Sequence, residues 1–182
     1  MKISRPTEAD TSDGGQTSTV CTLVIEPTEA RILVSLADQL QVLLADSLES
    51  PIDRDSAVRR LLPDAYRSDP ELSTEWRKLS RRGLVDRKIG YAHTISTALA
   101  PTIGADAAGS VPLTMDAALD WVRSIGDLRL VIADRMGIVV DGDDGTFAEP
   151  GLRDVYELLA WMQDGLVQVL DTAQTPSTPD TP

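Results

Sequence analysis

The stretch that decides the fold is LTMDAALDWVRSIGDLRLVIADRMG, residues 113–137. Thr114 is a residue type typical of a helix N-cap, and Asp116 follows in the first turn, where a negative charge suits the helix dipole. From there, apolar residues recur at helical spacing as far as Met136. Gly137 follows the last turn, where a left-handed cap is expected. The stretch therefore predicts one long helix at the centre of the protein.

The second half of this helix combines apolar residues on every face with charges. Leu128–Ala133 is almost continuously apolar, and a helix that is apolar all round is expected to be buried. Buried charges need partners, because their desolvation is costly. Two interpretations stay open, a polar pocket inside a helical bundle or a set of ion pairs that fixes helix register. The charges concerned are Asp127, Arg129, Asp134 and Arg135.

Working outward from the central stretch, four further helices are predicted. They cover residues 27–48, 53–62, 70–99 and 151–171, with Asp53 as N-cap of the second. The 70–99 segment changes phase near Ser80 and Gly83, so it contains either a kink or a break. The buried stripe expected for the first helix consists of Ile32, Leu33, Leu36, Leu40, Leu43, Leu44 and Ser47.

A short run, Val20–Glu26, favours a β-strand, and a single strand needs a partner. Residues 110–113 and 138–140 are the candidates. The predicted fold is therefore mainly all-α, a bundle of about five helices with a minor short β-pairing. We expect one helical domain over residues 19–172, with disordered polar tails at 1–18 and 173–182.

The charge is unevenly distributed along the chain. The whole sequence carries a net charge of −12, which disfavours non-specific binding to nucleic acid or anionic membrane. Residues 54–88, however, contain 10 Lys or Arg and 6 Asp or Glu, whereas the remainder contains 7 and 23. The 54–88 segment is therefore the candidate for binding an acidic surface.

Within that segment six basic residues lie close together, and they form a candidate interaction patch. They repel one another where they are four apart on a helix. Pairing within the fold or with an identical subunit, an acidic protein partner, or DNA phosphate would each relieve this repulsion. Interleaved acidic residues and the acidic remainder oppose DNA. The patch consists of Arg77, Lys78, Arg81, Arg82, Arg87 and Lys88.

The sequence offers no arrangement typical of catalysis, metal binding or cofactor binding. His93 and Cys21 are the single histidine and the single cysteine, too few for a zinc signature. The acidic run that starts at Asp141 lacks the Gly and Glu that an EF-hand loop needs, because Thr146 and Leu152 stand there. We therefore predict no metal, no cofactor and no catalytic residues, and expect a protein that is not an enzyme.

The location predicted from the sequence is the cytoplasm. No apolar run approaches the length of a membrane-spanning helix, so no membrane association is expected. The first residues lack the apolar stretch of a signal peptide. In the last helix, Leu158 and Trp161 extend the apolar face beyond the core stripe, which indicates a homodimer contact. That stripe consists of Leu152, Val155, Leu159, Met162, Leu166 and Val169.

Three segments, 61–88, 119–138 and 155–170, resemble DUF2017, a family of uncharacterised actinobacterial proteins. Pro63-Asp64-Ala65-Tyr66 corresponds to a P-x-A-Y element of the family. The stretch Gly126–Ile138 corresponds to its N-D-L-R-L-V-L-G-x-R-L-G-I-like core, with Gly126 in place of Asn. The resemblance implies a mainly helical fold. Genes of the family often lie beside that of a Clp-protease adaptor, which implies a link to proteolysis.

Three functional hypotheses follow from these observations. The first is a non-enzymatic, cytoplasmic protein-interaction or regulatory module, linked to Clp-type proteolysis by gene context. The second is a transcriptional regulator that binds DNA through residues 54–88. The third is a small-molecule binder or enzyme that uses the charged central helix.

Overall fold

The computed structural model describes residues 1–4, 18–49, 55–63, 70–140, 143, 145 and 151–174, with backbone only for residues 70–79 and 174. The elements are β1 (Lys2–Ser4), β2 (Thr19–Ile25), α1 (Pro27–Glu49), α2 (Ser56–Leu61), α3 (Pro70–Ile103), β3 (Gly109–Thr114), α4 (Met115–Arg135) and α5 (Leu152–Gln174). The prediction of a mainly helical bundle of five helices with a minor sheet is confirmed.

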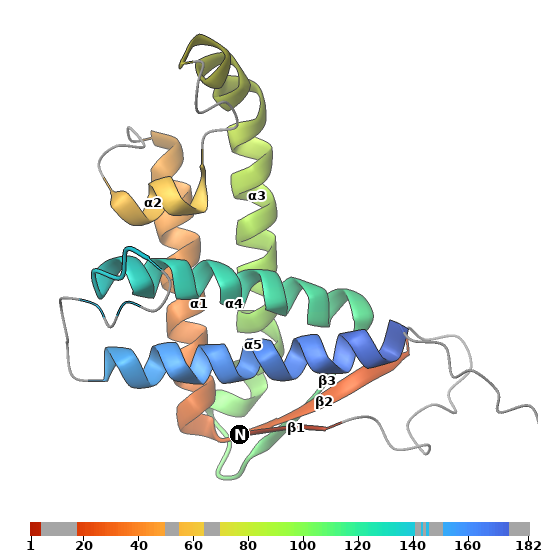
Figure 1. The fold of residues 1–182 in the computed structure, drawn as a ribbon. Coiled ribbons are helices and arrows are strands. Elements are labelled where there is room, and N and C mark those ends of the chain that lie inside the picture. Colours follow the sequence, from red (N-terminus) through yellow and green to blue (C-terminus); the bar gives the residue numbers. More distant parts are fainter. Residues whose placement is uncertain are drawn as a thin grey trace, which may run out of the picture.

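Two layers of helices cross at the centre of the molecule. Helices α1 and α3 run side by side, and α4 and α5 lie across them, with the sheet at one end (Figure 1). Helix α4 touches α1, α2, α3, α5 and two strands, so it is the hub of the packing. Its Trp121 and Ile125 are fully buried in the core. The stretch that begins at Leu113 thus occupies the central position expected from its sequence.

The sheet is antiparallel, with strand order β1-β2-β3. Ile3 lies opposite Leu23, and Leu23 lies opposite Val111 on the other side. Cys21, Leu23 and Ile25 are buried, and the residues between them are less so, because alternate side chains of a strand face opposite sides. One face of the sheet therefore belongs to the core.

The pairing of β2 was predicted in part. The candidate partner at residues 110–113 is correct, since β3 pairs with β2, whereas residues 138–140 form no strand. Strand β1 was not predicted, because Lys2–Ser4 is short and lies in the segment expected to be a tail. Its pairing with Thr22–Val24 supplies hydrogen-bond partners that are remote in sequence. Residues 5–17 and 175–182 of the predicted tails lie outside the described residues.

The ends of α4 are as predicted. Thr114 is the N-cap, and its Oγ1 accepts a hydrogen bond from the backbone N–H of Ala117 at 3.3 Å. After the helix, Gly137 has φ of 73°, the left-handed conformation that favours glycine. For α2, the predicted N-cap was wrong. Asp55, not Asp53, caps this helix and accepts from the N–H of Ala57 at 2.8 Å.

Two predicted burial patterns need correction. In α1 the buried face contains Ala30 and Ala37 between its leucines, whereas Ile32 is 38% exposed. The small alanines allow neighbouring elements to pack closely against this face of α1, and Ile32 lies outside it. In α4, Leu130 is 40% exposed, so the second half of the helix is not buried on every face.

Helix α3 is one continuous helix across Ser80 and Gly83, so the predicted alternative of two separate helices is wrong. It also continues through Pro101 to Ile103, beyond the predicted end. Pro101 lies in the last turn, where its missing N–H leaves only the backbone carbonyl of Thr97 without a helical hydrogen bond. Thr97 is exposed, so water can bind this carbonyl instead. Among the described helices, none combines the length and apolar composition that a membrane span needs.

Candidate functional site

The first charge of α4, Asp127, is paired with α3. The Lys88 Nζ donates to Asp127 Oδ1 at 2.5 Å, and their side chains are only 17% and 8% exposed. The second carboxylate oxygen of Asp127, Oδ2, is buried and has no hydrogen-bond partner among the described residues. Burial raises the pKa of Asp127, and the hydrogen bond and charge of Lys88 oppose this effect. The pair fixes α3 against α4 at a cost in desolvation.

Arg129 turns to the other side of α4 and contacts α5. Its guanidinium donates to Gln163 Oε1 at 2.7 Å and lies over the Tyr156 ring, 5.0 Å from the centroid. Gln163 Nε2 in turn donates to the backbone carbonyl of Val122 at 3.3 Å. A Cβ on Gly126 would lie 3.1 Å from the same Nε2. Glycine at this position therefore leaves room for the side chain that holds Arg129.

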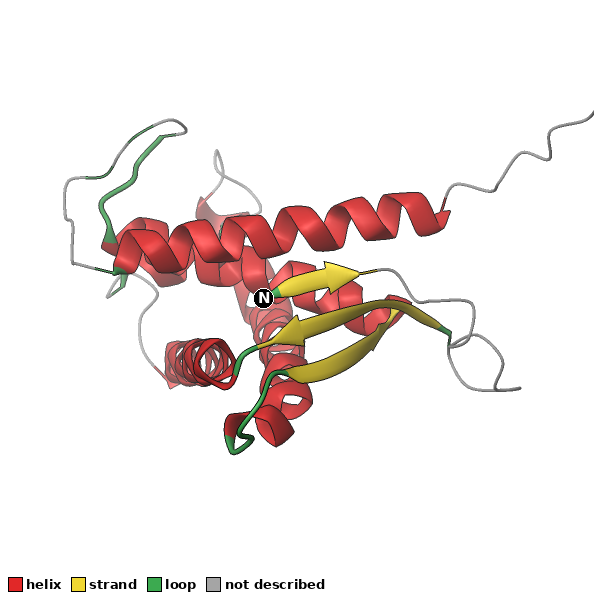
Figure 2. Cartoon of the chain, turned by 90° about the horizontal axis from the view of Figure 1, so that it is seen from below, coloured by secondary structure: helices red, strands yellow, loops and turns green. Residues whose placement is uncertain are grey.

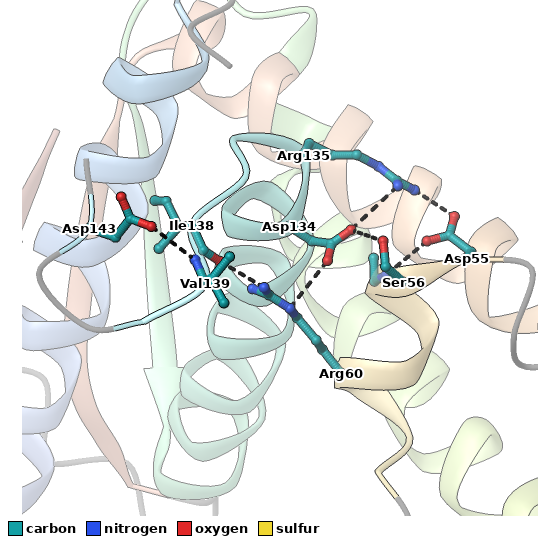
Figure 3. Close-up of polar contacts among 9 residues, drawn as sticks. Asp55, Ser56, Arg60, Asp134, Arg135, Ile138, Val139 and Asp143 are labelled. Atoms are coloured by element: carbon teal, nitrogen blue, oxygen red, sulfur yellow. Dashed lines mark hydrogen bonds and ion pairs between the residues drawn. The ribbon is translucent and has the colours of Figure 1, made fainter. Parts of the chain in front are cut away.

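Asp134 and Arg135 bind α2 (Figure 3). The Asp134 carboxylate pairs with Arg60 Nε at 3.2 Å and accepts from Ser56 Oγ at 2.5 Å. Arg135 donates to Asp55 Oδ2 at 2.6 Å. Arg60 Nη2 also donates to the carbonyl of Ile138 at 2.7 Å, just after α4. We call Asp55, Ser56, Arg60, Asp134 and Arg135 the α2 clamp.

Charge in the α2 clamp shifts two pKa values. The hydrogen bond from Arg135 is the largest effect on Asp55 and lowers the pKa of that carboxyl. The same hydrogen bond raises the pKa of Arg135. Asp55 thus both caps α2 and bonds α4, so its ionised form supports two contacts at once.

The four charges of α4 therefore contact three different helices. Only Asp134 and Arg135 approach one another, with 3.7 Å between Oδ2 and Nη1. Asp127 contacts α3 and Arg129 contacts α5. The described side chains include no group of three or more His, Cys, Asp or Glu placed to hold a metal ion. These contacts fix the register of α4 against α2, α3 and α5.

The predicted basic patch is divided by the fold. Arg81 donates to the carbonyl of Ser47 on α1, and Lys88 binds Asp127. Arg82 and Arg87 are exposed to solvent. The side chains of Arg77 and Lys78 lie outside the described part. In that part, the accessible charge of the patch consists of two arginines.

The exposed side of α3 has a feature that was not predicted from the sequence. Gly83 and Gly90 are exposed and seven residues apart, so they lie on the same face. A Cβ on either residue would meet nothing within 4 Å. Arg82 and Arg87 flank this face on opposite sides, and exposed Asp86 lies between Arg82 and Gly90. The only signal for it in the sequence is the pair of glycines inside a helical pattern, and such glycines predict a break in the helix more readily than a surface.

Comparisons with known proteins identify the family. A family model described as a domain of unknown function, DUF2017, matches residues 7–170. The chain belongs to the DUF2017 family. No curated protein and no solved structure matches it.

In this DUF2017 protein, the family-like core segment 126–138 carries most of the interhelical polar contacts among the described residues. Asp127, Arg129, Asp134 and Arg135 all lie in it, and the carbonyl of Ile138 accepts from Arg60. The other quoted element begins at Pro63, after α2, and continues from residue 64 into the part outside the described residues. The core segment of the DUF2017 chain is thus a structural junction of α2, α3, α4 and α5.

Proposed function

We propose that this DUF2017 protein is a non-enzymatic protein-interaction module of the cytoplasm, acting in regulation, and that the exposed side of α3 binds an acidic protein. The single observation that carries the proposal is the surface formed by Gly83 and Gly90 with Arg82 and Arg87 beside it. We call these four residues the α3 surface.

The two glycines support a binding role because they lower helix stability and no contact with the described side chains requires them. A glycine inside a helix is about 1 kcal/mol less favourable than alanine. Glycine is useful where another backbone must approach closely. At Gly83 and Gly90, apart from the adjacent residues and the helix's own backbone, no described atom lies within 4 Å of the position that a methyl group would take, so no neighbour in the described chain needs the space. Close approach of a partner explains both positions.

The charge on α3 supports an acidic partner. From Ser80 to Ile103 the helix contains four Lys or Arg and one Asp, in a chain with a net charge of −12. Lys88 is used internally by Asp127, whereas Arg82 and Arg87 are exposed. A partner carboxylate that meets these guanidinium groups forms a charge-assisted hydrogen bond with geometry that arginine favours.

The test is affinity capture of the tagged chain from crosslinked native cells. Wild type is compared with Arg82→Glu/Arg87→Glu and with Arg31→Glu as a control for charge reversal outside the α3 surface. Arg31 is an exposed arginine in the first turns of α1 and does not belong to the α3 surface. We expect a partner with an acidic contact surface that is lost with the double variant and retained with the control. Binding that also weakens with salt supports the charge pairing.

A second variant separates binding from folding. Gly83→Ala/Gly90→Ala is expected to fold at least as well as wild type and to lose the same partner, because two methyl groups block close approach. Retention of every partner by both α3 variants would overturn the proposal. Recovery of DNA with a steep salt dependence, lost in Arg82→Glu/Arg87→Glu, would replace it by the DNA-binding hypothesis. Loss of a Clp component in these variants would support the link to proteolysis.

A further inference from the structure

A groove lies between the C-terminal half of α5 and strand β1, at the opposite end of the molecule from α2. Its volume is about 750 Å³. It is lined by Ile3, Trp161, Asp164, Gly165, Gln168, Val169, Asp171 and Thr172. Trp161 is 48% exposed, a large apolar surface for a residue that makes up part of a groove wall. The groove is distinct from the α3 surface.

Ile3, in the edge strand of the sheet, lines one side of the groove. In the described part of the chain β1 pairs only with β2, so it is an edge (Figure 2). An edge strand presents backbone N–H and C=O groups to which another strand can add. Ile3 points from β1 toward α5, because a Cβ on Gly165 would lie 2.8 Å from Ile3 Cδ1. A strand added beside β1 would therefore direct every second side chain toward α5.

The α5 side of the groove determines which side chains such a strand would need. Asp164 is exposed, and no hydrogen bond or ion pair joins it to another described residue. Helix α5 as a whole contains four Asp or Glu and one Arg. Trp161 and Val169 offer apolar surface beside this carboxylate. Inward-facing apolar and cationic side chains match this wall.

The acidic parts of the chain itself do not complement the acidic groove. Residues 175–182, TPSTPDTP, contain one Asp and no Lys or Arg, so they carry the same charge as the groove. Two copies joined through their α5 surfaces would bring like charges together, with Glu157 and Asp164 exposed on each. An occupant with positive charge from another protein avoids both repulsions.

We infer that this groove binds an extended segment of another protein, which pairs with β1 and places apolar and cationic side chains against α5. Asp164 binds the cationic side chain and Trp161 contacts the apolar one. The site is separate from the α3 surface and does not depend on the function proposed for it.

The test uses a short synthetic peptide in which Val and Lys occupy alternate inward positions, separated by Thr. Binding is followed on the full chain through the fluorescence of Trp161. We expect a saturable change that is absent in Trp161→Phe. A peptide with Glu in place of Lys is expected not to bind, and one with Pro in place of the Thr residues is expected not to pair with β1.

Two variants with the same change in net charge complete the test. Asp164→Lys is expected to weaken binding by at least about tenfold, which corresponds to a loss of about 1.4 kcal/mol. Asp46→Lys, an exposed position on α1, is the control and is expected to bind as wild type does. Circular dichroism establishes that both variants are folded.

Three results would overturn the inference. One is the absence of a fluorescence change with the Val/Lys peptide, and another is equal binding by Asp164→Lys and wild type. The third is sedimentation evidence that the chain alone self-associates and that Trp161→Ala abolishes this, since a second copy would then occupy the groove.

Discussion

Lys88 Nζ lies 2.5 Å from Asp127 Oδ1, and this contact joins the midpoint of α3 to α4 across a site largely closed to water. Each partner alone would leave a charge that is poorly hydrated. The contact specifies which faces of the two helices meet, since no other described residue pairs with the Asp127 carboxylate. Its effect on stability depends on whether one partner or both are removed.

We predict that Asp127→Leu lowers the free energy of unfolding by about 2–3 kcal/mol, because Lys88 is left without its partner. Lys88→Met/Asp127→Leu is expected to regain most of this loss, since apolar side chains of similar size then fill the site. Urea unfolding followed by circular dichroism measures both. Equal stability of the single and double variants would contradict the prediction.

The same carboxyl predicts a pH dependence. Because burial raises the folded-state pKa of Asp127 above its usual value of about 3.8, the folded protein holds this proton more tightly than the unfolded chain. Its contribution to stability is therefore full below that value and is lost as pH rises through the raised pKa. The free energy of unfolding of wild type minus that of Asp127→Asn should fall with increasing pH in this window.

For Asp55 we predict a pH dependence of stability opposite in sign to that of Asp127. Arg135 lowers the pKa of Asp55 in the folded state, so its contribution is present above the usual value of about 3.8 and is lost as pH falls through the lowered pKa. The difference between wild type and Asp55→Asn should therefore rise with pH over the acid range. The same slope for both variants would contradict the assignment of either carboxyl.

The α2 clamp predicts unequal effects at two adjacent arginines. Arg60→Ala removes the ion pair with Asp134 and the hydrogen bond to the Ile138 carbonyl, and is expected to cost about 1–2 kcal/mol. Arg59→Ala is the control, because Arg59 is exposed, and a change within about 0.5 kcal/mol is expected. Thermal and urea unfolding measure both, and similar losses would contradict a specific contribution of Arg60 through the clamp.

Features that depend on local sequence were predictable. Thr114 and Gly137 delimit α4 because their preferences act on the adjacent backbone. The amphipathic pattern of the last helix places Leu159, Met162 and Leu166 in the core, and all three are buried. These contributions need no knowledge of the rest of the chain.

The partners of the α4 charges were not predictable, because they are set by how the helices pack. The pair Arg129 and Gln163 is separated by 34 residues, and Ser56 and Asp134 by 78. The sequence showed that the charges needed partners but not that they would contact three helices. Strand β1 was missed for a similar reason, since three residues carry too little pattern to outweigh a polar segment that follows.

Alanine substitutions at three glycines are predicted to change stability in opposite directions. Gly83→Ala and Gly90→Ala should each raise the free energy of unfolding by about 0.5–1 kcal/mol, since a methyl group meets no neighbour and alanine favours the helix. Gly109→Ala should instead lower it by about 1–3 kcal/mol, because its Cβ would lie 2.2 Å from the Oγ1 of buried Thr102. Urea unfolding distinguishes these directions. A loss of stability at Gly83 or Gly90 would mean that the fold itself needs these glycines, and the case for a partner on the α3 surface would lose its main support.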